Sequence, residues 1–325
     1  MKVTAIAHPN LALIKYWGRK DEELRLPANG SISINLSEMT TTTTVEFSEI
    51  FQSDQIQIGK KDVIEDSGRL AERLDRIRKL ANSDLYAKVV SVNNFPSSTG
   101  LSSSSSGFAA LTLAASSAIG LNLSEKELTI LARQGSGSAC RSIPNGWVEW
   151  NDASSSNESY AQSIFPSDHW DIVDIVAVVS SEKKDVPTSQ GQKLAQTSPF
   201  FTARQAEMPD KISKMKTYIE EKDFVPFGEL VEAEALNMHA IMITSTPSLI
   251  YWSIGTLRLI KQIKKWRNEG LPAFFTINTG QDIHILIEKG NLTALKKRLI
   301  NIPYIQKIFV NKVSDGAEIV NQHLF

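Results

Sequence analysis

The sequence has one cysteine, no long apolar run and almost no net charge. Cys140 is the only cysteine in 325 residues, which excludes an intramolecular disulfide and argues against a thiolate metal cluster. No segment approaches the ~20 uninterrupted apolar residues of a membrane helix, and the opening MKVTAIAHPN has no apolar signal core. Lys and Arg number 35 and Asp and Glu 36, so the chain has no overall field that would attract nucleic acid. We therefore expect a soluble, cytoplasmic, globular enzyme without a nucleic-acid or membrane partner.

The remaining composition fits two domains with separate cores. Apolar residues make up 42% of the chain and charged residues 22%, which is enough for one large domain or for two domains of ordinary size, each with its own core. Strand-like and helix-like patterns occur in both halves, which predicts two α+β domains rather than one parallel doubly wound sheet. The polar stretch 180–198 is the expected boundary, and it divides the chain into 1–183 and 184–325.

The spacing of apolar residues predicts individual elements. Residues 1–60 predict strands and turns, because their β-branched residues favour extended backbone. A helix over 69–82 would place Leu70, Leu74, Ile77 and Leu80 on one face. Other strands are expected at 88–92, 174–179, 274–277 and 283–287, and other helices from 107, from 124, and over 203–220, 227–243 and 255–268.

A serine-rich loop runs from Pro96 to Gly107, between the strand 88–92 and an apolar helix. Its last residues are expected to form the first turn of that helix, where free N–H groups and the helix dipole attract anions. Serine hydroxyls can bind phosphate or complete a magnesium shell. A flexible linker is the alternative, but the flanking strand and apolar helix favour a phosphate site. The loop is not a Walker A motif, because no Gly-Lys-Ser/Thr follows.

A second Gly/Ser segment, 135–142, follows a helix that Ser124 and Glu127 are expected to start with a capping box. Gly135 is explained as a glycine C-cap, which leaves the second glycine and two serines of GSGSACRS unexplained. Small residues let an anion approach, and Arg141 offers a planar fork for a carboxylate or phosphate. We interpret Cys140 as a packed residue rather than an activated thiol.

The segment 10–21 brings three cations close to a Tyr-Trp-Gly turn. Such a cluster forms either a solvated face or the rim of a pocket.

Three segments together resemble the diphosphomevalonate decarboxylase family, a branch of the GHMP small-molecule kinases. They are AHPNLALIKYWGRKDEELRLPANGSISINL, NNFPSSTGLSSSSSGFAAL and GSGSACRSIPNGWVEW. The resemblance implies a two-domain GHMP kinase fold, with an N-terminal domain like domain 2 of ribosomal protein S5 and a C-terminal α/β sandwich. The active site would lie in the cleft between them.

The resemblance also implies a reaction and its cofactors, ATP and Mg²⁺. ATP would phosphorylate the tertiary 3-hydroxyl of mevalonate 5-diphosphate. Phosphate and CO₂ would then leave and give isopentenyl diphosphate. Family members are commonly homodimers, so a homodimer is expected here.

Nucleotide-binding residues follow by position from the resemblance. Ser103 or Ser104 would lie near the magnesium, and Thr188 or Ser189 would face the nucleotide phosphates. The residues expected to surround the ATP phosphates are Asn93, Pro96, Gly100, Leu101, Ser102, Ser103, Ser104, Ser105 and Ser106.

Substrate-binding residues follow in the same way. Arg141 would fork onto the substrate carboxylate, with Asn10 positioning that arginine. Lys15 would help to hold the diphosphate and belongs to the expected catalytic group. The other residues expected at the substrate are Tyr16, Trp17, Arg19, Ser136, Gly137 and Ser138.

One departure from the family pattern concerns the catalytic base. The family motif FT-apolar-D-A-G reads FTINTG here, so Asn278 stands where the family has its aspartate. An amide cannot accept a proton at neutral pH, although it can orient a hydroxyl.

Three accounts of the departure stay open. Asn278 orients the hydroxyl while γ-phosphate oxygens accept the proton, or Asp282 has exchanged roles with it. Otherwise the substrate differs, as in a mevalonate or phosphomevalonate 3-kinase or a phosphomevalonate decarboxylase. A non-catalytic nucleotide-binding paralogue is a further alternative.

Overall fold

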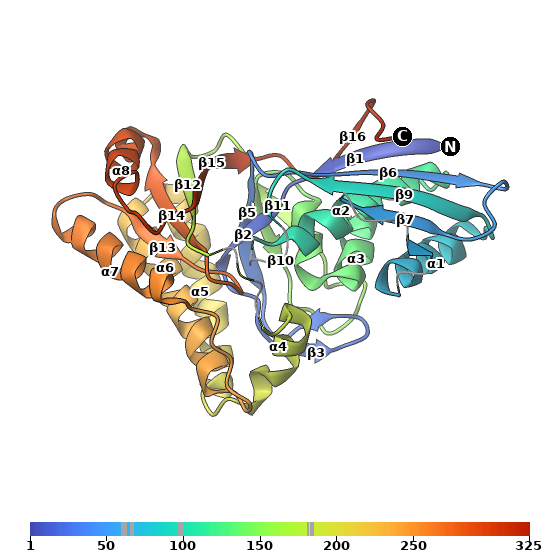
Figure 1. Ribbon diagram of the computed structural model, residues 1–325. Coiled ribbons are helices and arrows are strands. Elements are labelled where there is room, and N and C mark those ends of the chain that lie inside the picture. Colours follow the sequence, from blue (N-terminus) through green and yellow to red (C-terminus); the bar gives the residue numbers. More distant parts are fainter. Residues whose placement is uncertain (60–63, 66–67, 97–100, 181, 183–184) are drawn as a thin grey trace.

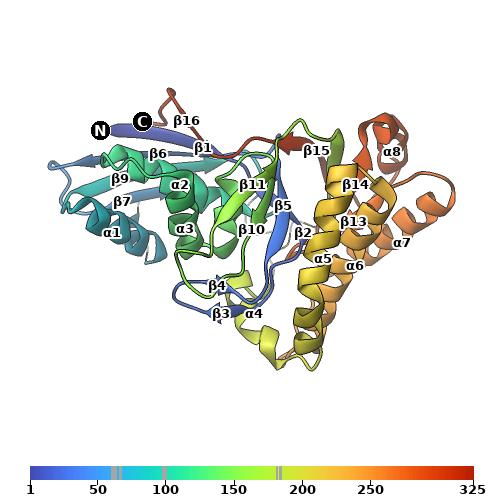
Figure 2. The same cartoon turned by 180° about the vertical axis from the view of Figure 1, so that it is seen from behind.

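The computed structural model describes residues 1–59, 64–65, 68–96, 101–180, 182 and 185–325. Two halves lie side by side, the N-terminal half with the helices of residues 69–135 and the C-terminal half with those of residues 201–299, while the red C-terminal strand at 318–320 returns to lie beside the first strand (Figures 1 and 2). Each half contains a β-sheet with helices packed on it. The α+β class expected from the sequence is confirmed, while the division at residue 184 stays a prediction.

The N-terminal half is built on a six-stranded sheet. Its strands follow in the order β16 (Glu318–Val320), β1 (Lys2–Ala7), β6 (Thr41–Ser48), β9 (Tyr86–Asn93), β7 (Gln55–Ile58) and β8 (Ile64–Glu65). Neighbouring strands are antiparallel except β7 and β9, which are parallel. The threonine run is central to the sheet, because Thr44 lies opposite both Thr4 on β1 and Val90 on β9.

One long helix, α2 (Ser103–Ala118), lies on strands β1 and β6. The alanines Ala110, Ala114 and Ala115 are fully buried there, and such small side chains let the helix approach the sheet closely. Two further helices pack beside α2, namely α1 (Arg69–Ala81) and α3 (Glu125–Gly135). This packing holds the first turn of α2, which the last serines of the serine-rich segment form, against the sheet.

A second, eight-stranded sheet continues through both halves. Its order is β11 (Ala161–Phe165), β10 (Trp147–Trp150), β5 (Ser31–Leu36), β15 (Lys307–Ser314), β12 (Ile172–Val178), β14 (Ile283–Glu288) and β13 (Phe274–Thr276), with β2 (Asn10–Ile14) paired to β5. Strand β15 joins the halves, because Val313 pairs with Leu36 and Val310 with Ile175.

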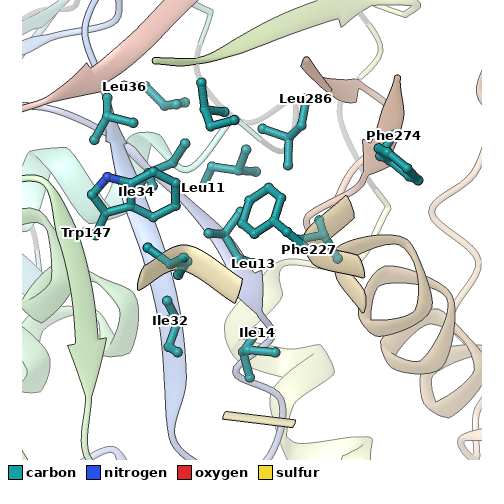
Figure 3. Packing of buried hydrophobic residues seen from close by; sticks show 14 of the residues in the cluster. Leu11, Leu13, Ile14, Ile32, Ile34, Leu36, Trp147, Phe227, Phe274 and Leu286 are labelled. Carbon is teal, nitrogen blue, oxygen red and sulfur yellow. The ribbon is translucent and has the colours of Figure 1, made fainter. Parts of the chain in front are cut away.

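Both faces of strand β12 are buried. The flanking helices are α5 (Phe201–Glu221), α6 (Phe224–Thr244), α7 (Ile254–Asn268) and α8 (Leu292–Leu299). Val173, Ile175 and Ala177 join the cluster that contains apolar residues of α7 and α8, whereas Ile172 and Val176 join the cluster of α5 and α6. This period of two is the geometry of a strand. Figure 3 shows the second cluster, in which Leu11, Leu13 and Phe227 lie close together.

Short elements complete the fold. They are β3 (Arg19–Asp21), β4 (Leu26–Pro27), and the 3₁₀ turns η1 (Gly137–Ser142), η2 (Ala195–Thr197) and η3 (Lys289–Asn291), with the helix α4 (Thr188–Leu194). Within the described ranges no helix is both long enough and apolar enough to span a bilayer.

The expected helices at 69–82, 203–220, 227–243 and 255–268 are confirmed within one to three residues at each end. The capping box at Ser124 and Glu127 is also confirmed. Leu80 was expected on the buried face of α1, but its side chain is 58% exposed. The sequence reasoning missed β10, β11, β15 and α8. The helix α8 could have been found, because Leu292, Leu295 and Leu299 have helical spacing.

The interpretation of Gly135 as a left-handed C-cap is wrong. Ser136 caps α3 in an extended conformation, and Gly135 is not among the glycines of positive φ. A Cβ at Gly135 would lie 2.5 Å from the Phe108 ring, so the glycine permits α3 to pack closely against α2.

Gly228 allows a similar close approach in the C-terminal half, where α6 packs on β13. A Cβ at Gly228 would lie 2.1 Å from ring carbon Cδ2 of Phe274, which is itself buried. We expect Gly228→Ala to lower the free energy of unfolding by about 1–3 kcal/mol through overpacking. The gain of roughly 1 kcal/mol that alanine normally brings to a helix is too small to offset this. Urea denaturation measures the difference.

Gly107→Ala in α2 is the matched control, because nothing lies within 4 Å of a Cβ at that position. It should leave the free energy of unfolding unchanged or raise it by up to about 1 kcal/mol. Equal effects at the two positions would contradict the packing argument.

Candidate functional site

A cavity of about 310 Å³ lies where the two halves meet. Its described lining comes from the end of β2, the start of α2, η1, α4 and the loop after β13. The lining residues are Asn10, Ala12, Lys15, Tyr16, Arg19, Arg25, Ser102, Ser103, Ser104, Ser136, Gly137, Ser138, Arg141, Pro187, Thr188, Ser189, Gln192, Met238, Asn278 and Thr279. Four of them are basic, namely one lysine and three arginines, and none of those described is Asp, Glu or His. Such a cavity is suited to a ligand with several negative charges.

The start of α2 forms one wall. Ser102 caps the helix in a left-handed conformation with φ 58°, which is rare outside glycine and is typical of functional sites. Ser103 and Ser104 also line the cavity, whereas Ser105 and Ser106 are buried. Ser106 holds the helix in place through a 2.6 Å hydrogen bond between its Oγ and Thr41 Oγ1.

Arg141 from η1 forms a second wall. It is 3% exposed, and its two terminal nitrogens donate to Ser31 Oγ at 2.7 Å and Asn10 Oδ1 at 3.1 Å. Its Nε has no hydrogen-bond partner in the described part of the chain. Burial lowers the pKa of Arg141, but a guanidinium stays protonated in proteins. A buried cation with neutral partners is costly unless an anion joins it, so the surroundings of Arg141 are suited to an anion.

Lys15 and Asn278 meet at the centre of the cavity. Lys15 Nζ donates to the Ala12 carbonyl at 2.6 Å and to Asn278 Oδ1 at 3.1 Å. Asn278 Nδ2 in turn donates to Ser102 Oγ at 3.3 Å, which links the C-terminal half to the start of α2. Burial lowers the pKa of Lys15 to about 7.

His239 of α6 positions Asn278 from behind. Its Nε2 lies 3.0 Å from the Asn278 carbonyl oxygen, and its ring packs on Trp252 with the centroids 4.8 Å apart. Burial lowers the pKa of His239 to about 3. The imidazole is therefore neutral, and its Nε2–H donates to the carbonyl.

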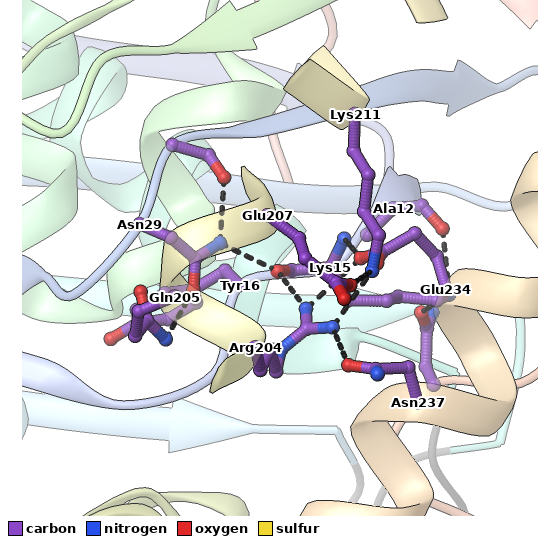
Figure 4. Close-up of polar contacts among 12 residues, drawn as sticks. Ala12, Lys15, Tyr16, Asn29, Arg204, Gln205, Glu207, Lys211, Glu234 and Asn237 are labelled. Carbon is purple, nitrogen blue, oxygen red and sulfur yellow. Dashed lines mark hydrogen bonds and ion pairs between the residues drawn. The ribbon is translucent and has the colours of Figure 1, made fainter. Parts of the chain in front are cut away.

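A buried ionic network fixes the backbone of Lys15 (Figure 4). Glu234 of α6 accepts from the Lys15 N–H at 3.2 Å, and Arg204 of α5 donates to the Lys15 carbonyl at 3.0 Å. Arg204 and Glu234 pair at 3.0 Å with neither side chain exposed, and Lys211 adds a second cation at 3.0 Å. Burial alone would raise the pKa of Glu234, but the two cations lower it below its ordinary value.

A third part of the cavity is formed by Arg19, Tyr16 and the serines of η1. Arg19 Nε donates to the Tyr16 hydroxyl at 2.8 Å, and the Tyr16 ring meets Trp150 edge-on at 4.7 Å between centroids. A Cβ at Gly137 would lie 2.8 Å from the Tyr16 hydroxyl, so this glycine makes room for the ring. Ser136 Oγ lies 3.5 Å from Ser104 Oγ, which joins η1 to the start of α2.

Several residues expected at the site do not line the cavity. Trp17 and Leu101 are buried in apolar clusters. Asn93 accepts a hydrogen bond from Thr41, and Pro96 is exposed at the edge of the described chain. Gly100 lies outside the described residues.

Two other expected residues have structural surroundings. Asp282 is buried away from the lining and accepts a 3.1 Å hydrogen bond from the Val179 N–H. Burial raises the pKa of the Cys140 thiol to about 12, which agrees with its interpretation as a packed residue.

Some lining residues were missed from the sequence. Gln192 accepts from the Gly18 N–H at 2.6 Å, but α4 lies in the polar stretch and gives no periodic signal. Thr279 bonds to Thr188 at 2.8 Å between hydroxyl oxygens, and its place beside Asn278 was the available clue. Glu234 lies behind the lining and was also missed, although helical spacing puts it on the buried face of α6 with Val231 and Met238.

The chain matches two family models. One describes a diphosphomevalonate decarboxylase-like N-terminal domain and matches residues 7–161. The other describes a mevalonate 5-diphosphate decarboxylase C-terminal domain and matches residues 174–320.

Relatives match over most of their length. The diphosphomevalonate decarboxylase of Candida albicans is 35% identical over 90% of this chain and 87% of its own. The phosphomevalonate decarboxylase of Haloferax volcanii is 34% identical over 88% of each. A solved structure of MDDEF in complex with MVAPP, AMPPCP and magnesium has a TM-score of 0.92 and 36% identity, covering 99% of both chains.

His239 is expected to make the fold sensitive to acid. Its pKa is about 3 in the folded protein against an ordinary 6.5, so below about pH 6.5 the unfolded chain binds a proton that the folded chain does not. The stability due to this group is fully present above pH 6.5 and is lost as the pH falls toward 3, at about 1.4 kcal/mol per pH unit. Urea titrations at several pH values measure this slope.

His239→Gln keeps an N–H donor but cannot titrate, so the pH dependence of unfolding should become flatter in this variant. His323→Gln, near the chain end, controls for the loss of an imidazole elsewhere. A slope that is unchanged in His239→Gln would refute a neutral, buried imidazole at this position.

Proposed function

The chain belongs to the diphosphomevalonate decarboxylase family, and we propose that its cavity carries out the ATP-dependent decarboxylation of mevalonate 5-diphosphate. The products are isopentenyl diphosphate, ADP, phosphate and CO₂. The observation that carries this proposal is the composition of the described lining, which combines three arginines and a lysine with no acidic side chain. A substrate with a carboxylate and a diphosphate, next to a nucleoside triphosphate, supplies the negative charge that these basic side chains attract.

Arg141 binds the substrate carboxylate. Ser31 and Asn10 each occupy one of its terminal nitrogens, which fixes the plane of the guanidinium. Directional N–H groups can then hold the carboxylate in one orientation. The bond between the carboxylate carbon and the neighbouring substrate carbon is thereby aligned for cleavage. Its electron pair forms the new double bond as CO₂ leaves.

The tail of the substrate binds beside Arg19, Tyr16, Ser136 and Ser138. Ser138 and Ser136 line the cavity within η1 and at its start, and Arg19 is held by Tyr16 and by Glu22 at 2.6 Å. A tertiary phosphate leaves through a cation-like centre, which nearby positive charge would disfavour. Holding cations at the tail and at the carboxylate avoids this penalty.

ATP binds at the start of α2, with its phosphates near Ser102, Ser103 and Ser104. The free N–H groups and dipole of this 16-residue helix favour phosphate. Thr188 and Ser189 approach from α4 on the other side.

Magnesium fits this wall as a nucleotide-bound ion. No group of three or more acidic, His or Cys side chains in the described chain could hold a metal by itself. Hydroxyl oxygens of Ser103 or Ser104, phosphate oxygens and water form the oxygen set that Mg²⁺ prefers. When bound, the ion neutralises charge on the transferred phosphoryl group.

A homodimer, which the family resemblance implies, belongs to the same proposal, as does a location in the cytoplasm. Sedimentation equilibrium of the purified protein tests the dimer, and a mass equal to one chain would refute it.

A phosphomevalonate decarboxylase is the second candidate. The Haloferax volcanii relative with that name is about as similar as the Candida albicans one. Both substrates carry an anionic tail, and they differ by one phosphoryl group.

One assay distinguishes these activities. Purified protein, ATP and magnesium are incubated with mevalonate, its 5-phosphate and its 5-diphosphate in parallel, and ADP and CO₂ are measured together. Equal amounts of ADP and CO₂, highest with the diphosphate, are expected. A preference for the monophosphate would establish the second candidate, and ADP without CO₂ would mean a 3-kinase.

Arg141→Ala should abolish decarboxylation almost entirely, by a factor of about 10²–10³ or more in kcat. Arg141→Lys keeps the charge but loses the planar fork, so its loss should be nearly as large. Thermal unfolding of both variants checks that the fold is intact. Near-normal CO₂ release from Arg141→Ala would disprove its assignment to the carboxylate.

A further inference from the structure

Phosphorylation of a tertiary hydroxyl releases a proton, and the cavity offers few groups that could accept it. The described lining holds hydroxyls, amides, three guanidinium groups and one amine. Guanidinium groups do not lose a proton in proteins, and amides do not gain one at neutral pH. Burial raises the pKa of the Tyr16 phenol, so it keeps its proton. The amine of Lys15 is the only side chain in this set that can act as a base.

The hydrogen bonds of Lys15 fit a neutral amine. Nζ has two described acceptors, the Ala12 carbonyl at 2.6 Å and Asn278 Oδ1 at 3.1 Å. A neutral amine has two N–H groups and one lone pair, so these acceptors use both hydrogens. An ammonium group has a third N–H, for which the described residues provide no further acceptor.

We propose that Lys15 accepts the proton of the substrate's tertiary hydroxyl as that oxygen attacks the γ-phosphorus of ATP. This inference rests on the proposed function and names the base for its first step. Asn278 is a positioning residue, since its Oδ1 orients the amine and its Nδ2 is tied to Ser102.

The step balances without any further reactant. The O–H bond breaks, and its proton binds the lone pair of Lys15 Nζ. The electron pair of the hydroxyl oxygen forms the new O–P bond, while the bond to the ADP oxygen breaks and its pair leaves with ADP. When the new phosphate departs with the C–O electron pair, Lys15 returns the proton to it or to solvent.

Charged groups around Lys15 come from four elements. Glu234 of α6 and Asp174 of β12 favour the ammonium form, whereas Arg141 of η1 and Arg204 of α5 oppose it. Glu234 already neutralises Arg204 and Lys211, so it is not an exclusive partner of Lys15. His239, which also belongs to α6, is neutral. Burial is the largest influence and brings the pKa of Lys15 to about 7, where a base works best at neutral pH.

Lys15→Arg is the decisive variant, because arginine keeps a positive charge for anion binding but cannot act as a base. The wild-type kcat should rise with pH through about 7 and then level off, since the amine must be unprotonated. Lys15→Arg should lose about 10²–10⁴-fold in kcat, and the rise with pH should disappear, with a much smaller change in KM. A rise of kcat with pH that persists in Lys15→Arg would come from the titration of a substrate phosphate and would overturn the proposal.

Lys15→Ala provides a second test that does not depend on arginine fitting the space. Added small amines should restore part of the rate, and the restored rate should increase with the basicity of the amine. The double variant Lys15→Met, Asn278→Asp should also be more active than Lys15→Met alone, because the aspartate supplies a new base beside the hydroxyl. No recovery with either would count against proton acceptance at this position.

Nuclear magnetic resonance gives a readout without turnover. In protein labelled at lysine Cε, the signal that is missing from Lys15→Arg should titrate near pH 7, whereas a midpoint above about 9 would refute the proposal.

Failure of the inference differs from failure of the proposed function. Wild-type protein that releases ADP and CO₂, with Lys15→Arg equally active, would refute only the role of Lys15. Wild-type protein that releases neither product from any mevalonate derivative would refute both.

Discussion

The site depends on the ionic and hydrogen-bonding interactions of the buried Glu234 carboxylate. It is 0% exposed and accepts from Arg204, from Lys211 and from the backbone N–H of Lys15. Removing one partner of such a network leaves an uncompensated buried charge, at a cost of roughly 3–5 kcal/mol. Because the network links α5 and α6 to the residue directly after β2, the side chain of Lys15 leaves the backbone at a fixed point. Contacts with distant elements therefore fix the backbone from which the Lys15 side chain extends, and hydrogen bonds to Ala12 and Asn278 hold its amine.

This arrangement separates charge by sign across the wall of the cavity. Glu234 and Asp174 lie behind the wall, whereas Lys15, Arg19 and Arg141 line it. The acidic groups keep the buried cations tolerable without competing with an anionic ligand for them. A carboxylate at position 278 beside an intact Lys15 would stabilise the ammonium form of the lysine. The uncharged amide of Asn278 accepts from Lys15 through Oδ1 and donates to Ser102 through Nδ2, which explains why an asparagine is compatible with a working site.

Much of the fold and part of the site could be predicted from the sequence. Long helices with clear periodicity, such as 203–220 and 255–268, were predicted because burial of one face dictates the spacing. The clustering of Lys15, Arg141 and Ser104 followed from local motifs and family resemblance. Gln192 could not be predicted, because its hydrogen bond to Gly18 depends on how two distant segments pack. Gly135 was misinterpreted because a glycine required for close packing and a glycine required for positive φ look the same in a sequence.

The arrangement of the two halves also explains how one cavity can hold a phosphoryl donor next to its acceptor. Strand β15 pairs with β5 and with β12 and so makes one sheet of both halves. The start of α2 and η1 then come from the N-terminal half, while Asn278 comes from the C-terminal half. Inside the cavity Ser104 contacts Ser136 within the N-terminal half, and Asn278 joins the two halves through its hydrogen bonds to Ser102 and Lys15. The sites proposed for the phosphoryl donor, at Ser102 and Ser104, and for the acceptor, at Arg141, are thereby kept in one frame. Since positioning supplies most of the rate in phosphoryl transfer, a weak base such as a buried amine is sufficient for the proton.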